Sequence, residues 1–82
     1  MSRKQNLIDK YFGDNLRKIR SNRTDERGKK MSQERFAEML DLDRTYYGRI
    51  ERGEHSASIE TCFKISEALG IHISDLFIDL PT

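Results

Sequence analysis

Four outward-facing side chains on one short predicted helix have the chemistry to recognise DNA. Arg44, Thr45 and Tyr46 open the segment from about 44 to 52, and Arg49 shares their face one turn further on. An arginine can donate two hydrogen bonds to guanine O6 and N7, worth about 1–3 kcal/mol of discrimination, and a threonine methyl can contact the thymine methyl. Side chains of these types can therefore reach base edges from a helix that lies against DNA. The alternative is that Arg44 and Arg49 are ordinary solvated side chains.

Other kinds of chemistry find little support in the sequence. The polar residues show no pairing of a nucleophile with a base and no glycine-rich phosphate loop. Cys62, His55 and His72 lack the spacing of metal ligands, and one cysteine cannot form an internal disulfide, so Cys62 is expected in the core. We therefore predict a protein that is not an enzyme and that uses no cofactor and no metal ion.

Charge is distributed unevenly along the 82 residues, although the net charge is only +1. Residues 1–30 carry ten basic and four acidic side chains, residues 31–53 carry four and five, and residues 54–82 carry one and five. The three parts therefore have charges of +6, −1 and −4. This pattern predicts a molecule with a basic side, suited to a polyanion, and an acidic side.

Apolar residues recur at helical spacing throughout, which predicts an all-α fold. Helices are expected at about 4–20, 33–40, 44–52, 58–70 and from 74 onward, with a polar loop at 21–30. Their candidate N-caps from the second helix on are Ser32, Asp43, Ser58 and Ser74. In the fourth helix the expected apolar series is Ile59, Cys62, Phe63, Ile65, Ala68 and Leu69. We predict a single domain over residues 1–82, folded as a compact five-helix bundle.

A short turn at 41–43 brings the second and third helices into steep contact, as in a helix-turn-helix at about 33–52. The motifs around it are Met31-Ser32-Gln33-Glu34-x-Phe36-Ala37, Leu42-Asp43-Arg44-Thr45-Tyr46, Ile50-Glu51-Arg52-Gly53 and Ser58-Ile59-Glu60-Thr61. In this order they resemble the Cro/repressor (XRE) class of lambda-repressor-like DNA-binding domains, over about residues 12–77. The second and third motifs are most similar to the controller proteins of restriction-modification systems.

The resemblance implies a homodimeric transcriptional regulator that binds a palindromic operator in double-stranded DNA. Such a regulator could also contact RNA polymerase. Arg44, Thr45 and Arg49 fall where the class reads bases, and Tyr46 falls where it touches a phosphate or a base edge. A phage-type repressor, or an antitoxin that binds both an operator and a toxin protein, is the alternative.

Further roles follow from the same resemblance. Gln33 falls where the class holds a backbone phosphate, at a helix start that also attracts anions. Ser32, Arg35 and Arg52 are further phosphate candidates, with Arg35 equally suited to a surface salt bridge. Glu51 falls where the class pairs a glutamate with an arginine at the end of the first helix, here Arg20. That ion pair is expected to be structural.

The features that depart from the class include a long loop and an unusual turn residue. The loop at 21–30 is longer than usual, and its basic residues could reach flanking phosphates or simply lie in solvent. Asp41 stands where glycine or asparagine is usual, so the turn should form with a small penalty.

The last third of the chain is unusually apolar for a short terminal helix. Its large apolar residues are Ile71, Ile73, Leu76, Phe77, Ile78 and Leu80. Because a small domain cannot bury all of them, we expect a symmetric dimer interface within about 58–80. No run of residues is apolar enough to cross a membrane or to act as a secretory signal, so we expect a cytoplasmic protein.

Overall fold

The computed structural model describes the backbone of residues 3–79 and the side chains of residues 7–79. It contains the α-helices α1 (Arg3–Ser21), α2 (Gln33–Met39), α3 (Arg44–Glu51) and α4 (Ile59–Leu69), followed by the 3-10 helix η1 (Ile73–Phe77). Over this described part there is no β-strand, which agrees with the predicted all-α class. The expected count of five helices is not confirmed: four are α-helices, and the last element is a short 3-10 helix.

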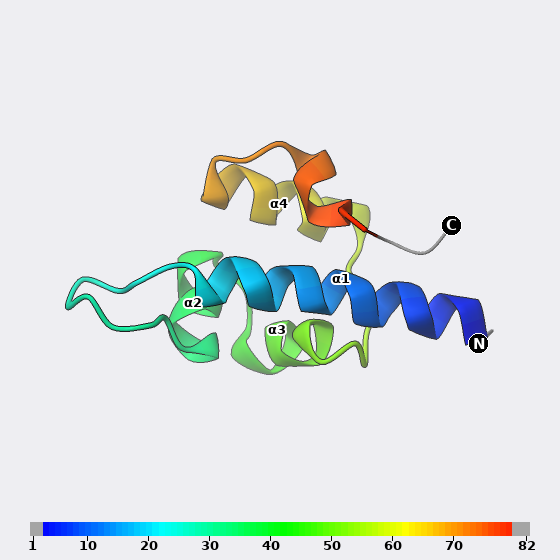
Figure 1. Cartoon of the computed structure of the whole chain (residues 1–82), viewed down its shortest axis with the longest axis horizontal. Helices are drawn as coiled ribbons and strands as arrows, with labels where there is room; N and C mark the ends of the chain where they lie inside the picture. The colour runs from blue at the N-terminus through cyan, green and yellow to red at the C-terminus, as the bar shows by residue number, and fades with distance from the viewer. Residues whose placement is uncertain (1–2, 80–82) are drawn as a thin grey trace.

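Helix α1 is the central element of the fold. It has 19 residues, and at 1.5 Å per residue it is about 28 Å long. Helix α3 packs on one side of it, and α4 with η1 covers the opposite side (Figure 1). The buried apolar side chains are Phe12, Leu16, Phe36, Ala37, Leu40, Tyr47, Ile50, Cys62, Ile65, Leu69 and Leu76. Every helix contributes to this core, and Cys62 lies in it as predicted.

Position 13 is a glycine, and because it has no side chain α1 can approach the end of α3. A β-carbon at this position would lie 2.5 Å from the carbonyl oxygen of Ile50 and would also collide with the carbonyl oxygen of Glu51. Real β-carbons do not come that close to backbone atoms. The position of the third helix on the first therefore depends on glycine at position 13.

Three of the four predicted N-caps are confirmed. The side chains of Ser32, Asp43 and Ser58 each accept a hydrogen bond from the backbone amide three residues later, at 3.0–3.1 Å. The prediction of Ser74 as the last N-cap is wrong. His72 takes that position instead, because its Nδ1 accepts from the amide of Ser74 at 3.2 Å while its own amide donates to Asp75.

The helix predicted through this apolar series is present as α4, but only part of the series is buried. Cys62, Ile65 and Leu69 are buried, but Ile59 and Phe63 are 76% and 53% exposed. Ala68 is also exposed. Because Ile59 and Phe63 are four residues apart, they lie on one face of the helix and form an apolar stripe beside the core.

The turn between α2 and α3 contains one residue with a left-handed backbone conformation. Asp41 has φ = 57°, and Leu42 donates its amide to the carbonyl of Ala37 at 2.9 Å. An aspartate in this conformation costs about 1 kcal/mol relative to glycine. The expected small penalty at position 41 therefore has a structural cause.

The segment 22–30 forms a small hairpin instead of an open loop. Thr24 and Lys30 make an isolated antiparallel β-bridge, and Gly28 has φ = 77° in the turn. The hairpin projects beyond the end of α1 and leads directly into α2 (Figure 1).

Candidate DNA-binding surface

The exposed face of α3 carries the side chains predicted to read bases. Arg44, Thr45 and Arg49 are all exposed, while Tyr47 and Ile50 fix the opposite face of the helix in the core. Arg44 makes a 3.5 Å ion pair with Glu34 of α2, in which both side chains are about 70% exposed. Such an exposed pair contributes little to stability, so the Arg44 guanidinium can exchange its partner at small cost.

Tyr46 is held more closely to the protein than expected. Its side chain is half-buried, its hydroxyl lies 3.2 Å from Thr61 Oγ1 on α4, and its ring meets the His55 ring edge-on at 5.4 Å. The hydroxyl can therefore accept or donate one further hydrogen bond, but the ring is positioned by α4. This differs from the free outward position that the sequence suggested.

The phosphate candidates at the start of α2 have different local roles. Ser32 uses its hydroxyl to cap the helix, accepting from the amide of Arg35 at 3.1 Å. Gln33 donates its side-chain amide to Glu51 Oε1 at 3.0 Å, so its side chain is turned toward α3. Both residues remain at the amino end of α2, where free backbone amides favour an anion.

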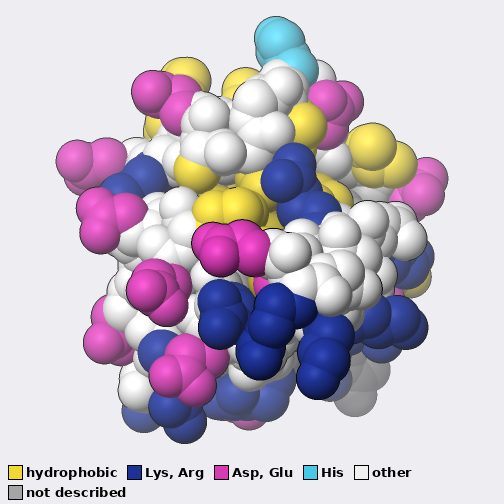
Figure 2. All heavy atoms as spheres, turned by 90° about the vertical axis from the view of Figure 1, so that its left-hand side faces the viewer, with side chains coloured by type: hydrophobic (Ala, Val, Ile, Leu, Met, Phe, Trp, Pro, Cys, Tyr) yellow, Lys and Arg dark blue, Asp and Glu magenta, His cyan; other side chains and the backbone are white. Residues whose placement is uncertain are grey.

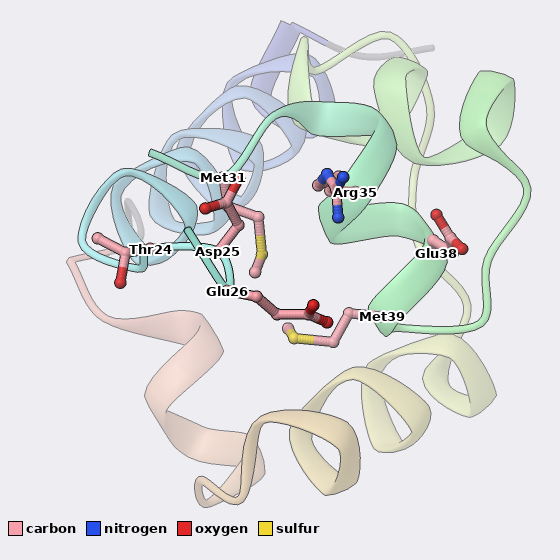
Figure 3. Close-up of a pocket in the computed structure, with 7 residues that line it drawn as sticks. All are labelled: Thr24, Asp25, Glu26, Met31, Arg35, Glu38 and Met39. Atoms are coloured by element: carbon pink, nitrogen blue, oxygen red, sulfur yellow. The ribbon is translucent and has the colours of Figure 1, made fainter. Parts of the chain in front are cut away.

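Arg35 faces the hairpin 22–30 rather than α3. It lines a shallow groove between the hairpin and α2, together with Thr24, Asp25, Glu26, Met31, Glu38 and Met39 (Figure 3). Arg35 makes no ion pair in the described part of the chain, so the two roles that the sequence left open, a surface salt bridge and contact with a phosphate, both stay predictions.

Arg52 follows α3 and is held by a neighbouring carboxylate. Its Nε and Nη2 donate to the two carboxylate oxygens of Glu54 at 3.0 and 3.3 Å. Because both side chains are about half exposed, the pair is screened by water. The Arg52 guanidinium can therefore turn from Glu54 to a phosphate.

The predicted ion pair between Arg20 and Glu51 is present and joins several elements. Arg20 Nε and Nη2 donate to the two oxygens of Glu51 at 3.0 and 2.7 Å, and Arg20 Nη1 donates to the carbonyl of Met31 at 3.0 Å. Gln33 adds the third hydrogen bond to Glu51. One carboxylate and one guanidinium thus fix α1, the end of the hairpin, α2 and α3 relative to one another.

Burial and hydrogen bonding act in opposite directions on Glu51. Burial alone would raise the pKa of this carboxyl, but the hydrogen bonds from Arg20 and Gln33 lower its pKa below the ordinary value. The hydrogen bond to Glu51 in turn raises the pKa of Arg20. Beside them, burial raises the pKa of Tyr47 far above its usual range, and the Tyr47 hydroxyl has no hydrogen-bond partner among the described residues.

The residues assigned to a dimer interface are only partly exposed. Phe77 and Ile78 are 41% and 53% exposed, and Ile71 and Ile73 are half-buried against the core. The assignment of Leu76 to an interface is wrong, because its side chain is fully buried within its own domain. Leu80 lies outside the described residues.

Sequence reasoning missed part of the exposed apolar surface beside η1. A groove next to Phe77 is lined by Ile8, Phe12, Ala57 and Cys62, together with Asp9 and Ser56. Ile59 and Phe63, which the sequence assigns to the apolar series of the fourth helix, are also exposed. Helical spacing alone cannot tell which edge of an apolar stripe remains in solvent.

Basic side chains are unevenly distributed over the surface. Figure 2 looks onto the hairpin end of the molecule, with α2 and α3 in its lower half and α4 and η1 above. Most of the Lys and Arg side chains visible there lie in the lower half, whereas apolar side chains gather higher up. Acidic side chains lie in both halves of this view, so the separate acidic side predicted from the charge pattern is not seen on this face.

Two short helices joined by a tight turn, with arginines on the exposed face of the second, define a helix-turn-helix. The helix-turn-helix family model matches residues 25–76. The chain therefore belongs to this family, and it is a DNA-binding transcriptional regulator rather than an enzyme.

Similar proteins narrow the class further. The chain is 48% identical over 75 residues to the control protein C.MunI of Mycoplasma sp, covering 92% of this chain and 95% of that protein. It is 42% identical over 77 residues to the control protein C.BamHI of Bacillus amyloliquefaciens, covering 94% and 88%. The crystal structure of the restriction-modification controller protein C.AhdI from Aeromonas hydrophila superimposes with a TM-score of 0.68 at 36% identity, covering 84% of this chain and 96% of that one.

Membrane-spanning helices and metal-binding clusters are both missing from the described residues. None of the helices within residues 3–79 is long and apolar enough to span a membrane. The same part of the chain contains no group of three or more His, Cys, Asp or Glu side chains placed to hold a metal ion.

Proposed function

We propose that the protein acts in the cytoplasm as a homodimer that controls a restriction-modification operon by binding a palindromic operator. The observation that carries this proposal is the exposed row of Arg44, Thr45 and Arg49 on a helix fixed to the scaffold through Glu51. A rigid short helix can enter the major groove, where these side chains meet base edges. Two such helices about one duplex turn apart would read half-sites roughly 10 bp from centre to centre.

Phosphate contacts hold the reading helix in register on the duplex. Ser32 and Gln33 offer backbone amides at the start of α2, while Arg35, Arg52 and Tyr46 offer side-chain donors around α3. Arg52 would exchange Glu54 for a phosphate, in the same way that Arg44 would exchange Glu34 for a base. Because each phosphate contact releases counterions, affinity should fall steeply as the salt concentration rises.

The dimer interface that we propose lies around η1 and the adjoining apolar edge of α4. Phe77 and Ile78 are its centre, with contributions from the half-buried Ile71 and Ile73 and from the exposed Phe63. An isologous contact through this surface covers apolar area that is otherwise exposed. It also leaves α3, on the other side of α1, open to DNA (Figure 1).

Substitution of Arg44 tests the base-reading assignment. A duplex selected from random sequences by the wild-type protein, and a scrambled duplex of equal length, serve as probes in a fluorescence anisotropy assay. Arg44→Ala should reduce the preference for the selected duplex by about tenfold, since a bidentate contact to guanine is worth about 1–3 kcal/mol. Lys64→Ala on α4, which removes the same charge elsewhere, should leave the preference unchanged. An unchanged preference in Arg44→Ala would refute the assignment.

The dimer is tested separately by analytical ultracentrifugation. Phe77→Ser or Ile78→Ser should be monomeric at micromolar concentration and still folded by circular dichroism. Tyr11→Ser on α1 removes a side chain of similar exposure, 45%, and should stay dimeric. If the Phe77 and Ile78 variants sediment as dimers, the interface lies elsewhere.

The control of a restriction-modification operon is tested in the neighbouring DNA. Genes for an endonuclease and a methyltransferase, with a palindrome upstream, would support it, and a reporter fused to that promoter would then show activation or repression. A neighbouring toxin gene would instead favour a DNA-binding antitoxin. RNA polymerase is a partner of the proposed regulator if activation is seen.

A further inference from the structure

We propose that the hairpin 22–30 is a second DNA-binding element, which contacts backbone phosphates flanking the bases read by α3. This inference rests on the proposed function, because it assumes that α3 lies in the major groove. The hairpin would enlarge the footprint of each protomer on the duplex and increase affinity without reading sequence.

The hairpin has a defined shape without DNA. Asp25 Oδ1 accepts hydrogen bonds from the amides of Arg27 and Lys29 at 2.9 and 3.0 Å. The backbone of Asp25 adds two more bonds, donating to the carbonyl of Lys29 at 2.7 Å and accepting from Gly28 at 3.0 Å. Because these bonds order the turn in advance, little backbone conformational entropy is lost when the hairpin binds DNA.

Both arms of the hairpin are fixed to the rest of the domain. On the first arm, Arg23 Nη2 donates to the carbonyl of Leu69 at the end of α4, at 3.2 Å. On the second arm, the carbonyl of Met31 accepts from Arg20, the same guanidinium that holds Glu51 of α3. The base of the hairpin is therefore tied to α4 and to the guanidinium that also holds α3.

The charges of the hairpin suit a polyanion. Arg27, Lys29 and Lys30 are all exposed, and none of them takes part in an ion pair in the described part of the chain. Asp25 is occupied by the turn, and Glu26 is directed into the groove beside α2, toward Met39 (Figure 3). The hairpin lies at the end of the molecule where Figure 2 shows basic side chains concentrated in the lower half.

The position of the hairpin along the chain places these charges beside the expected DNA backbone. Lys30 precedes Ser32 by two residues, so their α-carbons are at most about 7 Å apart. Ser32 and Gln33 form the start of α2, which we propose to contact a phosphate. The long side chains of Lys29 and Lys30 can therefore reach the next phosphates outside the half-site.

The experiment compares two duplexes that differ only in length. Both carry the sequence selected by the wild-type protein; the short one ends at the edges of the half-sites, and the long one extends about one helical turn, roughly 10 bp, beyond each edge. Affinity is measured by anisotropy at several salt concentrations. Lys29→Gln/Lys30→Gln should bind the long duplex about tenfold more weakly, and its salt slope should be smaller by about 0.9 for each phosphate that the variant no longer neutralises.

Several comparisons make the result decisive. The control Lys18→Gln/Lys64→Gln removes the same charge from α1 and α4 and should match the wild type. On the short duplex the hairpin variant should also approach the wild type. Equal salt slopes for the hairpin variant and the wild type on the long duplex would overturn the inference while leaving the proposed function intact. Failure of the wild type to prefer any selected duplex would instead overturn the proposed function.

Discussion

Removal of Arg20 should destabilise the domain more than any other single loss of charge. The Glu51 side chain is only 2% exposed, and its carboxylate accepts three hydrogen bonds. In Arg20→Met it would keep only the one from Gln33. Breaking a buried pair in this way costs about 3–5 kcal/mol, whereas replacing both partners by apolar residues is often close to neutral. A domain of this size has a total stability of about 4–12 kcal/mol, so the single variant should be close to unfolding.

Urea denaturation followed by circular dichroism can measure this in a double-mutant cycle. Arg20→Met should lose about 3–5 kcal/mol, and Arg20→Met/Glu51→Leu should recover most of that loss. A loss below about 1 kcal/mol in Arg20→Met, or a double variant whose loss equals the sum of the two single ones, would refute the reasoning.

The same pair has a defined pH dependence. The pKa of Glu51 is lower in the folded protein than the ordinary pKa of a glutamate carboxyl. The ionised Glu51 carboxylate therefore stabilises the folded state fully at pH values above that ordinary pKa. That contribution is lost as the pH falls through the lowered pKa. Stability of the wild type should therefore decrease toward acid more steeply than that of Arg20→Met/Glu51→Leu.

Three further substitutions test other features of the fold, each by urea denaturation at neutral pH. Tyr47→Phe should change stability by less than about 1 kcal/mol, because the hydroxyl has no partner to lose among the described residues; a cost above about 2 kcal/mol would mean that a hydrogen bond exists there. Gly13→Ala should cost at least about 1–3 kcal/mol, since its β-carbon would meet the carbonyl of Ile50, and a neutral result would contradict the close helix contact. Asp41→Gly should raise the free energy of unfolding by about 1 kcal/mol, because it relieves the left-handed conformation at φ = 57°. It also removes an exposed ion pair with Lys64, which should cost little. A net destabilisation would show that the ion pair matters more than the backbone conformation.

Features set by local chemistry could be predicted from the sequence. Ser32, Asp43 and Ser58 are recognisable as caps because a short polar side chain before an apolar series has few other roles. The same reasoning favours Ser74 over His72 and is wrong there, because a histidine ring nitrogen can accept the same hydrogen bond. The pairing of Arg20 with Glu51 follows from resemblance to a family and not from spacing.

Features that depend on packing could not be predicted in this way. Phe63 and Leu76 are both large, apolar and at helical spacing, yet the first is 53% exposed and the second is fully buried. Their difference arises from how η1 docks on α1 and α4, which no local pattern specifies. Tyr46 likewise follows the start of α3 in sequence, but contact with Thr61 of a later helix determines where its hydroxyl lies.

The burial of Leu76 has a consequence for the response to protein concentration. Leu76 and Leu16 are fully buried within one chain, and Asn15 donates to the carbonyls of Leu76 and Ile78, so the subunit completes its core without a partner. In the proposed dimer, association therefore joins two folded subunits. At low concentration the amount of dimer then rises with the square of the amount of protein. A promoter controlled by such a dimer would stay empty while the protein is scarce and fill over a narrow range as it accumulates.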